Sequence, residues 1–157
     1  MYKTPSHLPE AARADISRTL NERLADGLDL HSQIKVAHWN VRGPQFPALH
    51  PLFDQLATRL ALHNDTLAER AVILGGIARG TARHVARVSR LAEYPDNTTR
   101  DLDHVAALAD RIETYLGGVR EARSVAEQHA DIDTVDLLTG VISDFEKTAW
   151  FLRATLA

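Results

Sequence analysis

The sequence of 157 residues contains no cysteine, only one methionine, and no apolar run long enough to cross a bilayer. Without cysteine there is neither a disulfide nor a thiolate metal site, and no oxidising compartment is needed. The first residues lack the apolar core of a signal peptide. An excess of basic residues is also lacking: 18 Lys and Arg stand against 21 Asp and Glu, for a formal net charge of −3. We therefore expect a cytoplasmic protein without a membrane partner, and not one that holds DNA by a basic globular surface.

Proline and glycine are sparse, with six and eight residues, and they divide the chain into a few long segments. Apolar residues at spacings of three and four predict long amphipathic helices at residues 10–39, 48–74, 99–129 and 131–156. Pro51 is tolerated only in the first turn of a helix, so the second helix is expected to begin near it. Residues 77–98 are weakly patterned, which predicts a long connection with a short helix inside it.

Four long helices with a long crossover between the second and the third predict an all-α fold. The expected architecture is a ferritin-like four-helix bundle with a short helix in the crossover, rather than a simple up-and-down bundle. The length and the 45 % of hydrophobic residues fit a single domain over residues 1–157. Within it, residues 1–9 are expected to form a short mobile N-terminal tail.

Two pairs of potential metal ligands lie four residues apart: His50 with Asp54, and Asp65 with Glu69. Residues four apart share one face of a helix. Asp54 and Asp65 are separated by eleven residues, which make roughly three turns, so all four side chains lie on one stripe. Eleven residues span about 16 Å of helix axis, whereas metal–ligand bonds are about 2 Å long. One chain therefore offers two half-sites rather than one complete site.

The spacing suggests how the half-sites meet. The position numbers of His50 and Glu69 add to 119, and so do those of Asp54 and Asp65. If this helix packs antiparallel against its copy across a two-fold axis, His50 faces Glu69 of the partner subunit, and Asp54 faces Asp65 of the partner subunit. His38, in the last turn of the first helix, can supply a second imidazole.

The types of ligand limit which metal ions the site can bind. Carboxylates and imidazoles without sulfur suit Fe(II), Zn or Mn. Taken alone, each acidic pair also fits an ordinary solvated helix face, because charged side chains are mostly exposed. On these residues by themselves, zinc binding and plain surface charge both stay open.

The flanking residues resemble a known family. The segment HWNVRGPQF at residues 38–46, followed by LHPLFD at residues 49–54, resembles the signature of the Dps family, the DNA-protection-during-starvation mini-ferritins. Residues 65–76, DTLAERAVILGG, resemble its second half, and DTVDLL at residues 133–138 also fits. The likeness covers nearly the whole chain and is weakest at residues 77–100.

The resemblance implies a homo-oligomer, a dodecameric shell with ferroxidase activity and a di-iron centre at the subunit interface that handles iron as Fe2+ and Fe3+. It implies that one subunit supplies His38, His50 and Asp54, and that its two-fold mate supplies Asp65 and Glu69, as catalytic and metal ligands. It also implies hydrogen peroxide as the favoured oxidant, a ferric mineral stored inside, and protection of the cell and its DNA from oxidative stress. The Glu-x-x-His motif of larger ferritins is absent.

For four further residues, two alternative roles stay open. The resemblance suggests that Trp39 lies near iron and could scavenge oxidising equivalents; the alternative is a core or interface aromatic. Asp131, Asp133 and Asp136 lie at the start of the last helix. They would either line an acidic pore that draws iron in, or cap the helix and offset its dipole.

Nucleic-acid binding is the main alternative function, with a nucleoid-associated location. Residues 1–20 hold three basic and two acidic side chains, a net of +1, so phosphate-driven affinity is expected to be weak. The crossover carries more positive charge, from Arg79, Arg83, Arg87 and Arg90. The rival hypotheses are thus a non-specific DNA-binding nucleoid protein with little iron chemistry, and a structural helical oligomer with an inert or zinc-filled site.

Overall fold

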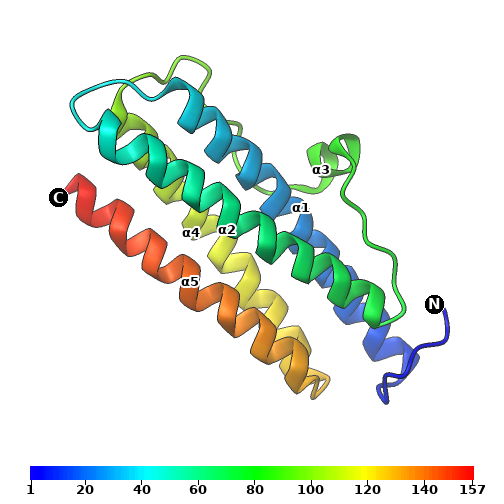
Figure 1. Ribbon diagram of the computed structural model, residues 1–157. Helices are drawn as coiled ribbons and strands as arrows, with labels where there is room; N and C mark the ends of the chain where they lie inside the picture. Colours follow the sequence, from blue (N-terminus) through cyan, green and yellow to red (C-terminus); the bar gives the residue numbers. More distant parts are fainter.

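The computed structural model describes all residues, 1–157, and contains five α-helices and no strand. Four long helices run side by side as a bundle, and a short helix stands outside it in the crossover (Figure 1). This confirms the predicted all-α bundle. The helices are α1 (Glu10–Asn40), α2 (Phe46–Ile73), α3 (Ala82–Val88), α4 (Asp101–Gln128) and α5 (Ile132–Leu156).

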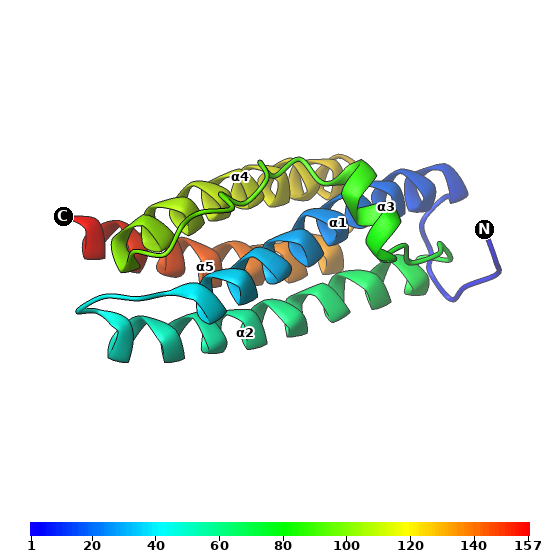
Figure 2. The ribbon, with the colours of Figure 1, turned by 90° about the horizontal axis from the view of Figure 1, so that it is seen from above.

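The bundle is built from two antiparallel pairs. α1 packs against α2 and α4 against α5, while α1 also contacts α4 and α3. The crossover leaves the end of α2, passes α3 and runs back along the bundle to the start of α4, beside the α1–α2 loop (Figure 2). The C-terminus lies at the end of the bundle that holds the α1–α2 loop, and the N-terminus lies at the other end (Figure 1).

The core follows from the apolar stripes of the four long helices. A single cluster of 30 buried apolar residues fills the bundle. Tyr115 of α4 and Phe145 of α5 meet edge to face at its centre, with ring centroids 5.4 Å apart, and both are fully buried. None of the five helices combines the length and the apolar character that a bilayer crossing requires.

The second helix begins two residues before the predicted residue 48, and the expectation that Pro51 lies in its first turn is wrong. α2 begins at Phe46 and contains Pro51 in its interior. The residue four positions before Pro51 is Pro47, in the first turn, and the backbone N–H groups of Ala48 and Leu49 already donate to Gln45 O. A helix loses one bond at an internal proline, and the packing of α2 against α1 offsets that loss here.

A buried carboxylate fixes the crossover on the bundle. Asp26 of α1 is fully buried and accepts hydrogen bonds from the backbone N–H of Arg90 at 2.9 Å and from its guanidinium at 3.1 and 3.2 Å. Arg23 lies 3.4 Å from the same carboxylate. Glu121 of α4 accepts from Arg90 at 2.9 Å. The crossover is therefore tied to α1 and α4 by charge-assisted hydrogen bonds.

The first residues of the chain contact the end of α2. The hydroxyl of Tyr2 donates to Val72 O, and that of Thr4 donates to Ile73 O, both at 2.5 Å. Val72 O also accepts from the backbone N–H of Gly75 at 2.8 Å, whereas Ile73 O is a carbonyl of the last turn that has no other backbone partner. The mobility expected for residues 1–9 stays a prediction.

Candidate metal centre

The α1–α2 loop is held in one shape by the start of α4. Gly43 has a φ of 139°, and a Cβ atom there would lie 2.4 Å from Asp101 Oδ2. The Asp101 carboxylate accepts from the backbone N–H of Gln45 at 2.8 Å, and the backbone N–H of Asp101 donates to Arg42 O at 2.9 Å. Only glycine combines this conformation with so close an approach. The loop thereby fixes the end of α1 against the start of α2.

This junction brings His38 and His50 together. Their rings stack with centroids 3.8 Å apart and an interplanar angle of 25°. His38 Nδ1 lies 2.8 Å from His50 O, and His50 Nδ1 lies 2.9 Å from His38 O. A carbonyl oxygen can only accept, so each Nδ1 carries the proton and each Nε2 keeps a free lone pair. A metal-binding histidine uses the same arrangement, with one nitrogen anchored and the other free to coordinate.

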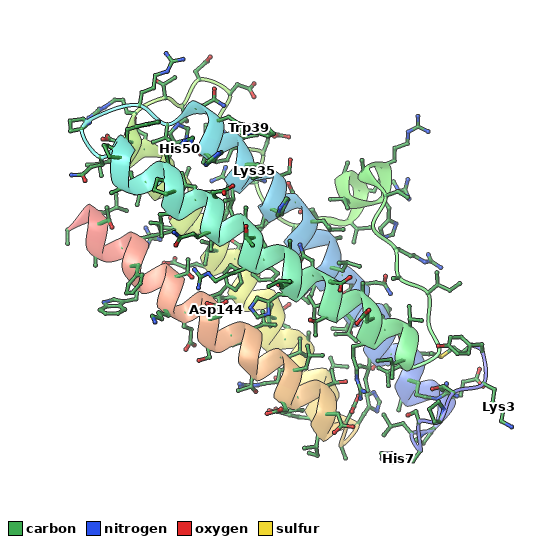
Figure 3. All side chains as sticks on the ribbon, in the orientation of Figure 1. Lys3, His7, Lys35, Trp39, His50 and Asp144 are labelled. Carbon is green, nitrogen blue, oxygen red and sulfur yellow. The ribbon has the colours of Figure 1, made fainter.

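Asp54 lies one turn beyond His50, and its carboxylate is paired with Lys35 of α1. The Nζ atom of Lys35 donates to Asp54 Oδ1 at 2.7 Å. This hydrogen bond holds the pKa of Asp54 below its usual value. Figure 3 shows Lys35, Trp39 and His50 near the same end of the bundle. The sequence reasoning missed Lys35, although its position three residues before His38 places both side chains on one face of α1.

Asp65 and Glu69 lie farther along α2, on its exposed side. The structure does not bring them to His38, His50 and Asp54, and no group of three or more potential ligands forms within one chain. A hollow of about 340 Å³ adjoins Asp65 and is also lined by His31 and Asn64. The five candidate ligands thus occupy two separate places in the subunit, and their meeting across a two-fold axis stays a prediction.

The structure distinguishes between the two hypotheses for some of the four further residues, Trp39, Asp131, Asp133 and Asp136. Asp131 is buried, accepts from the backbone N–H of Thr134 as the N-cap of α5, and pairs with Arg70 at 2.7 Å. The capping reading is confirmed for Asp131, while Asp133 and Asp136 are exposed. The core reading of Trp39 is wrong, because 68 % of its surface is exposed.

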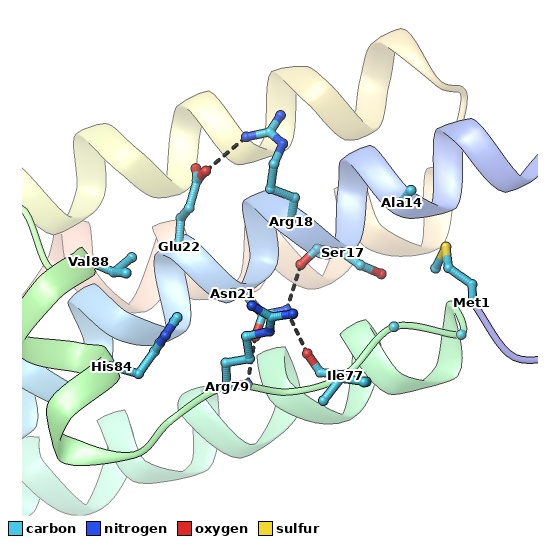
Figure 4. A pocket seen from close by; sticks show the side chains of 12 residues that line it. Met1, Ala14, Ser17, Arg18, Asn21, Glu22, Ile77, Arg79, His84 and Val88 are labelled. Atoms are coloured by element: carbon cyan, nitrogen blue, oxygen red, sulfur yellow. Dashed lines mark hydrogen bonds and ion pairs between the residues drawn. The ribbon is translucent and has the colours of Figure 1, made fainter.

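A larger hollow, about 510 Å³, lies elsewhere (Figure 4). It is formed by the first half of α1, the N-terminus and the crossover, and Asn21 bridges its walls by donating to Ile77 O and accepting from the backbone N–H of Arg79. None of the five candidate ligands lines it. Size therefore does not mark the candidate metal centre in this protein.

Comparisons with known proteins cover nearly the whole chain. The model of the ferritin-like domain matches residues 18–157. Over 153 residues the chain is 39 % identical to a DNA protection during starvation protein of Agrobacterium fabrum (strain C58), covering 98 % of this chain and 94 % of that protein. DpsC from Streptomyces coelicolor superposes with a TM-score of 0.94 at 33 % identity, covering 99 % of this chain and 91 % of that chain.

A more distant neighbour bears on the fold alone. A Dps protein from Vibrio cholerae O1, described as a member of a broad superfamily of ferritin-like diiron-carboxylate proteins, superposes with a TM-score of 0.92. The two chains are 23 % identical, and the match covers 100 % of this chain and 99 % of that chain. The same bundle with the same crossover is therefore preserved despite extensive sequence change.

Proposed function

Because the chain belongs to the Dps family of ferritin-like proteins, we propose that it is a ferroxidase and an iron-storage mini-ferritin. It oxidises Fe(II) with hydrogen peroxide and stores the ferric product inside a hollow shell of identical subunits. By removing both reactants it protects the cell and its DNA. We place it in the cytoplasm, where a protein without cysteine needs no disulfide.

One observation carries the proposal: His38 and His50 are locked by each other's backbone with both Nε2 lone pairs free. Together with the Asp54 carboxylate one turn away, once it is released from Lys35, these two nitrogens would offer three ligands of the mixed type that suits Fe(II). The site contains no sulfur. Fe(II) is the substrate here, and the imidazoles bind it before oxidation.

The second half of the centre is the exposed pair Asp65 and Glu69. Hard carboxylate oxygens stabilise the higher charge of Fe(III), so this pair favours the product. Since both half-sites lie on α2, a two-fold axis that crosses this helix joins one half from each subunit. Every two-fold pair then holds two complete centres, which makes assembly a condition for activity.

The electron count explains the value of a two-iron centre. Two Fe(II) ions give two electrons to one hydrogen peroxide molecule, and with two protons the products are two Fe(III) ions and two water molecules. Splitting the same peroxide with one electron would release a hydroxyl radical. The centre suppresses that outcome by presenting both electrons together.

The test is complementation between two inactive variants, His50→Ala and Asp65→Ala. Each variant alone lacks a ligand at every centre. A pair formed from one subunit of each kind has one centre without either ligand and one centre with both. Subunits mixed at random from equal amounts should therefore regain about a quarter of the parental centres. Optical measurement of iron oxidation with peroxide follows the recovery.

The control variant is His7→Ala combined with Asp96→Ala, which removes the same residue types from exposed positions away from the centre. It should oxidise iron at the parental rate. If the mixed His50→Ala and Asp65→Ala assemblies stay as inactive as either parent, the ligands do not come from two subunits. If His50→Ala alone keeps full activity, these residues do not carry the reaction.

A second candidate function is DNA binding by the crossover. Arg79, Arg83 and Arg87 are exposed, and no acidic side chain pairs with them. Arg90 differs, since Asp26 and Glu121 neutralise it. Three free cations per subunit, repeated over a shell, would bind phosphates in a salt-dependent way. A gel-shift titration of the Arg79→Ala, Arg83→Ala, Arg87→Ala variant against the parent at low salt tests this; equal retardation of both would exclude the crossover.

A further inference from the structure

Tyr94 and His104 form a buried hydrogen-bonded pair where the crossover meets α4. The phenolic oxygen of Tyr94 lies 2.6 Å from His104 Nδ1, and the two rings are nearly parallel, with an interplanar angle of 13°. Tyr94 is 5 % exposed and His104 is fully buried. The end of the crossover that carries Tyr94 runs back along the bundle toward the start of α4 (Figure 2). Neither residue belongs to the candidate metal centre.

The proton in this pair lies on the phenol. The Tyr94 hydroxyl has no other hydrogen-bond partner, so it donates to Nδ1 of His104. The ring proton of the neutral imidazole then lies on Nε2, which is buried without a hydrogen-bond partner, and the nearby backbone carbonyl of Asn40 favours the proton on the ring. Burial lowers the pKa of His104, so the ring is neutral near pH 7. Burial also raises the pKa of Tyr94 above its usual value, so the phenol keeps its proton in the resting protein.

Arg111 of α4 holds the Tyr94 ring in place and connects it to α1. Its guanidinium lies 5.4 Å from the ring centroid and donates to Gln33 Oε1 and to Glu93 O, each at 2.5 Å. Gln33 and Asn40 are both on α1, the helix that carries His38 near its end. The pair is thus packed against the same helix as the imidazole half of the candidate centre.

The other two tyrosines lack such a partner. Tyr2 donates to the backbone carbonyl of Val72, which is not a base, and it is exposed. The hydroxyl of Tyr115 is fully buried and has no hydrogen-bond partner. A phenol that loses an electron becomes a strong acid, and its proton must leave at once when the positive charge cannot be solvated. Of the three, only Tyr94 has an acceptor for that proton.

We propose that Tyr94 and His104 are a redox-active pair, in which Tyr94 gives up one electron while its phenolic proton moves to Nδ1 of His104. This inference rests on the proposed function for its oxidant, hydrogen peroxide reacting at the iron centre. The pair supplies the second electron when only one Fe(II) is bound. One Fe(II), Tyr94, neutral His104, one hydrogen peroxide and two protons give Fe(III), the Tyr94 phenoxyl radical, protonated His104 and two water molecules.

The pair is restored by the next ferrous ion. One Fe(II) passes an electron to the phenoxyl radical, and the proton on His104 returns to the phenolic oxygen. Over the cycle, two Fe(II) ions have reduced one peroxide, as in the two-iron reaction. A partly filled centre therefore reduces peroxide fully to water and releases no hydroxyl radical.

The experiment uses the assembled full-length protein with ring-deuterated tyrosine, read by electron paramagnetic resonance, in a Tyr2→Phe background that removes the exposed tyrosine. One arm contains no iron and oxidises the protein with flash-generated tris(bipyridine)ruthenium(III). The other arm mixes substoichiometric Fe(II) with hydrogen peroxide and freezes the sample. Tyr94→Phe is compared with Tyr115→Phe, which removes the hydroxyl of the other buried tyrosine. His104→Gln keeps a polar side chain that cannot take up a proton.

In the iron-free arm we expect a tyrosyl signal in the background protein and in Tyr115→Phe, and its loss in Tyr94→Phe and in His104→Gln. A signal that survives in Tyr94→Phe, or none in the background protein, overturns the redox pair whatever iron does. In the iron arm the same pattern ties the pair to peroxide reduction. A tyrosyl radical formed with ruthenium but not with iron and peroxide overturns the proposal that Tyr94 supplies the second electron. Iron oxidation by His50→Ala separates the two possible failures: a parental rate means that the proposed iron centre is wrong, and a lost rate means that only the role of Tyr94 is wrong.

Discussion

His38 and His50 each donate the Nδ1 proton to the backbone carbonyl of the other, and their rings stack 3.8 Å apart. Neither ring can turn without breaking both its own hydrogen bond and the stacking. The two Nε2 atoms are therefore presented to an incoming ion in a fixed orientation, so that little ordering is left for binding itself. The Asp101 carboxylate supports this geometry from α4, since it holds the loop between the two histidines.

Lys35 competes with the metal for Asp54, and Lys35→Met should strengthen metal binding. The ammonium group lowers the pKa of Asp54 and occupies its carboxylate, and an incoming cation must displace it. The pair is exposed and screened by water, so the gain is small, and affinity for Co(II) should rise by at most about fivefold. Calorimetric titration measures the change, with Lys147→Met as the exposed control. Equal or weaker binding in Lys35→Met would exclude the competition.

Asp26→Asn should destabilise the protein strongly. The substitution removes the fully buried carboxylate that pairs with Arg23 and Arg90, and leaves them only the more exposed carboxylates of Glu22 and Glu121. Removing one member of a buried charge cluster typically costs about 3–5 kcal/mol. Denaturant unfolding measures the loss, and Asp96→Asn, at an exposed position without an ion pair, should change stability little. Similar unfolding curves for the two variants would show that Asp26 does not hold the crossover.

Gly27→Ala and Gly140→Ala should act in opposite directions, although both glycines lie inside helices. A Cβ atom at Gly27 would lie 2.0 Å from Asn64 Oδ1, and such overpacking costs about 1–3 kcal/mol. At Gly140 nothing lies within 4 Å, and alanine should stabilise the helix by about 0.5–1 kcal/mol. Thermal unfolding gives both values. Adding Asn64→Ala to Gly27→Ala should recover stability; no recovery would rule out the Asn64 contact as the cause.

Asp15→Asn should be less stable than the parent protein at neutral pH, and this difference should disappear in acid. Hydrogen bonds from His129 at 3.0 Å and from Arg18 at 2.5 Å hold the pKa of Asp15 below its usual value. A lowered pKa means that the stabilisation is present above the pKa of the unfolded chain, about 4, and is lost as pH falls through the lower folded value. Asp15→Asn should therefore be less stable at pH 7 by at most about 1 kcal/mol, because the pair is partly exposed.

Unfolding of Asp15→Asn and of the parent, measured from pH 7 down to acid, gives the difference at each pH. The two curves should converge as Asp15 becomes protonated in both states. A gap that stays constant with pH would assign the loss to packing rather than to charge.

The sequence predicted the four long helices within about two residues at nearly every end, because apolar spacing and helix-breaking residues are local signals. At the start of α2 the predicted boundary was two residues late, because Pro51 was expected in the first turn but lies inside the helix. The expectation that proline is confined to the first turn considers only the backbone hydrogen bond that proline removes. It does not include the free energy gained by burying Leu49 and Phe53. Tertiary packing decided that boundary.

The sequence by itself determined which side chains of α2 share a stripe, since 3.6 residues per turn fix the positions of His50, Asp54, Asp65 and Glu69 on any helix. Only the tertiary structure decided the protonated nitrogens of His38 and His50, the pairing of Lys35 with Asp54, and the use of Asp131 as a cap rather than a free acid. These contacts join different helices. Their geometry depends on how the helices cross and on which loop holds them. The spacing of residues along the sequence does not contain this information.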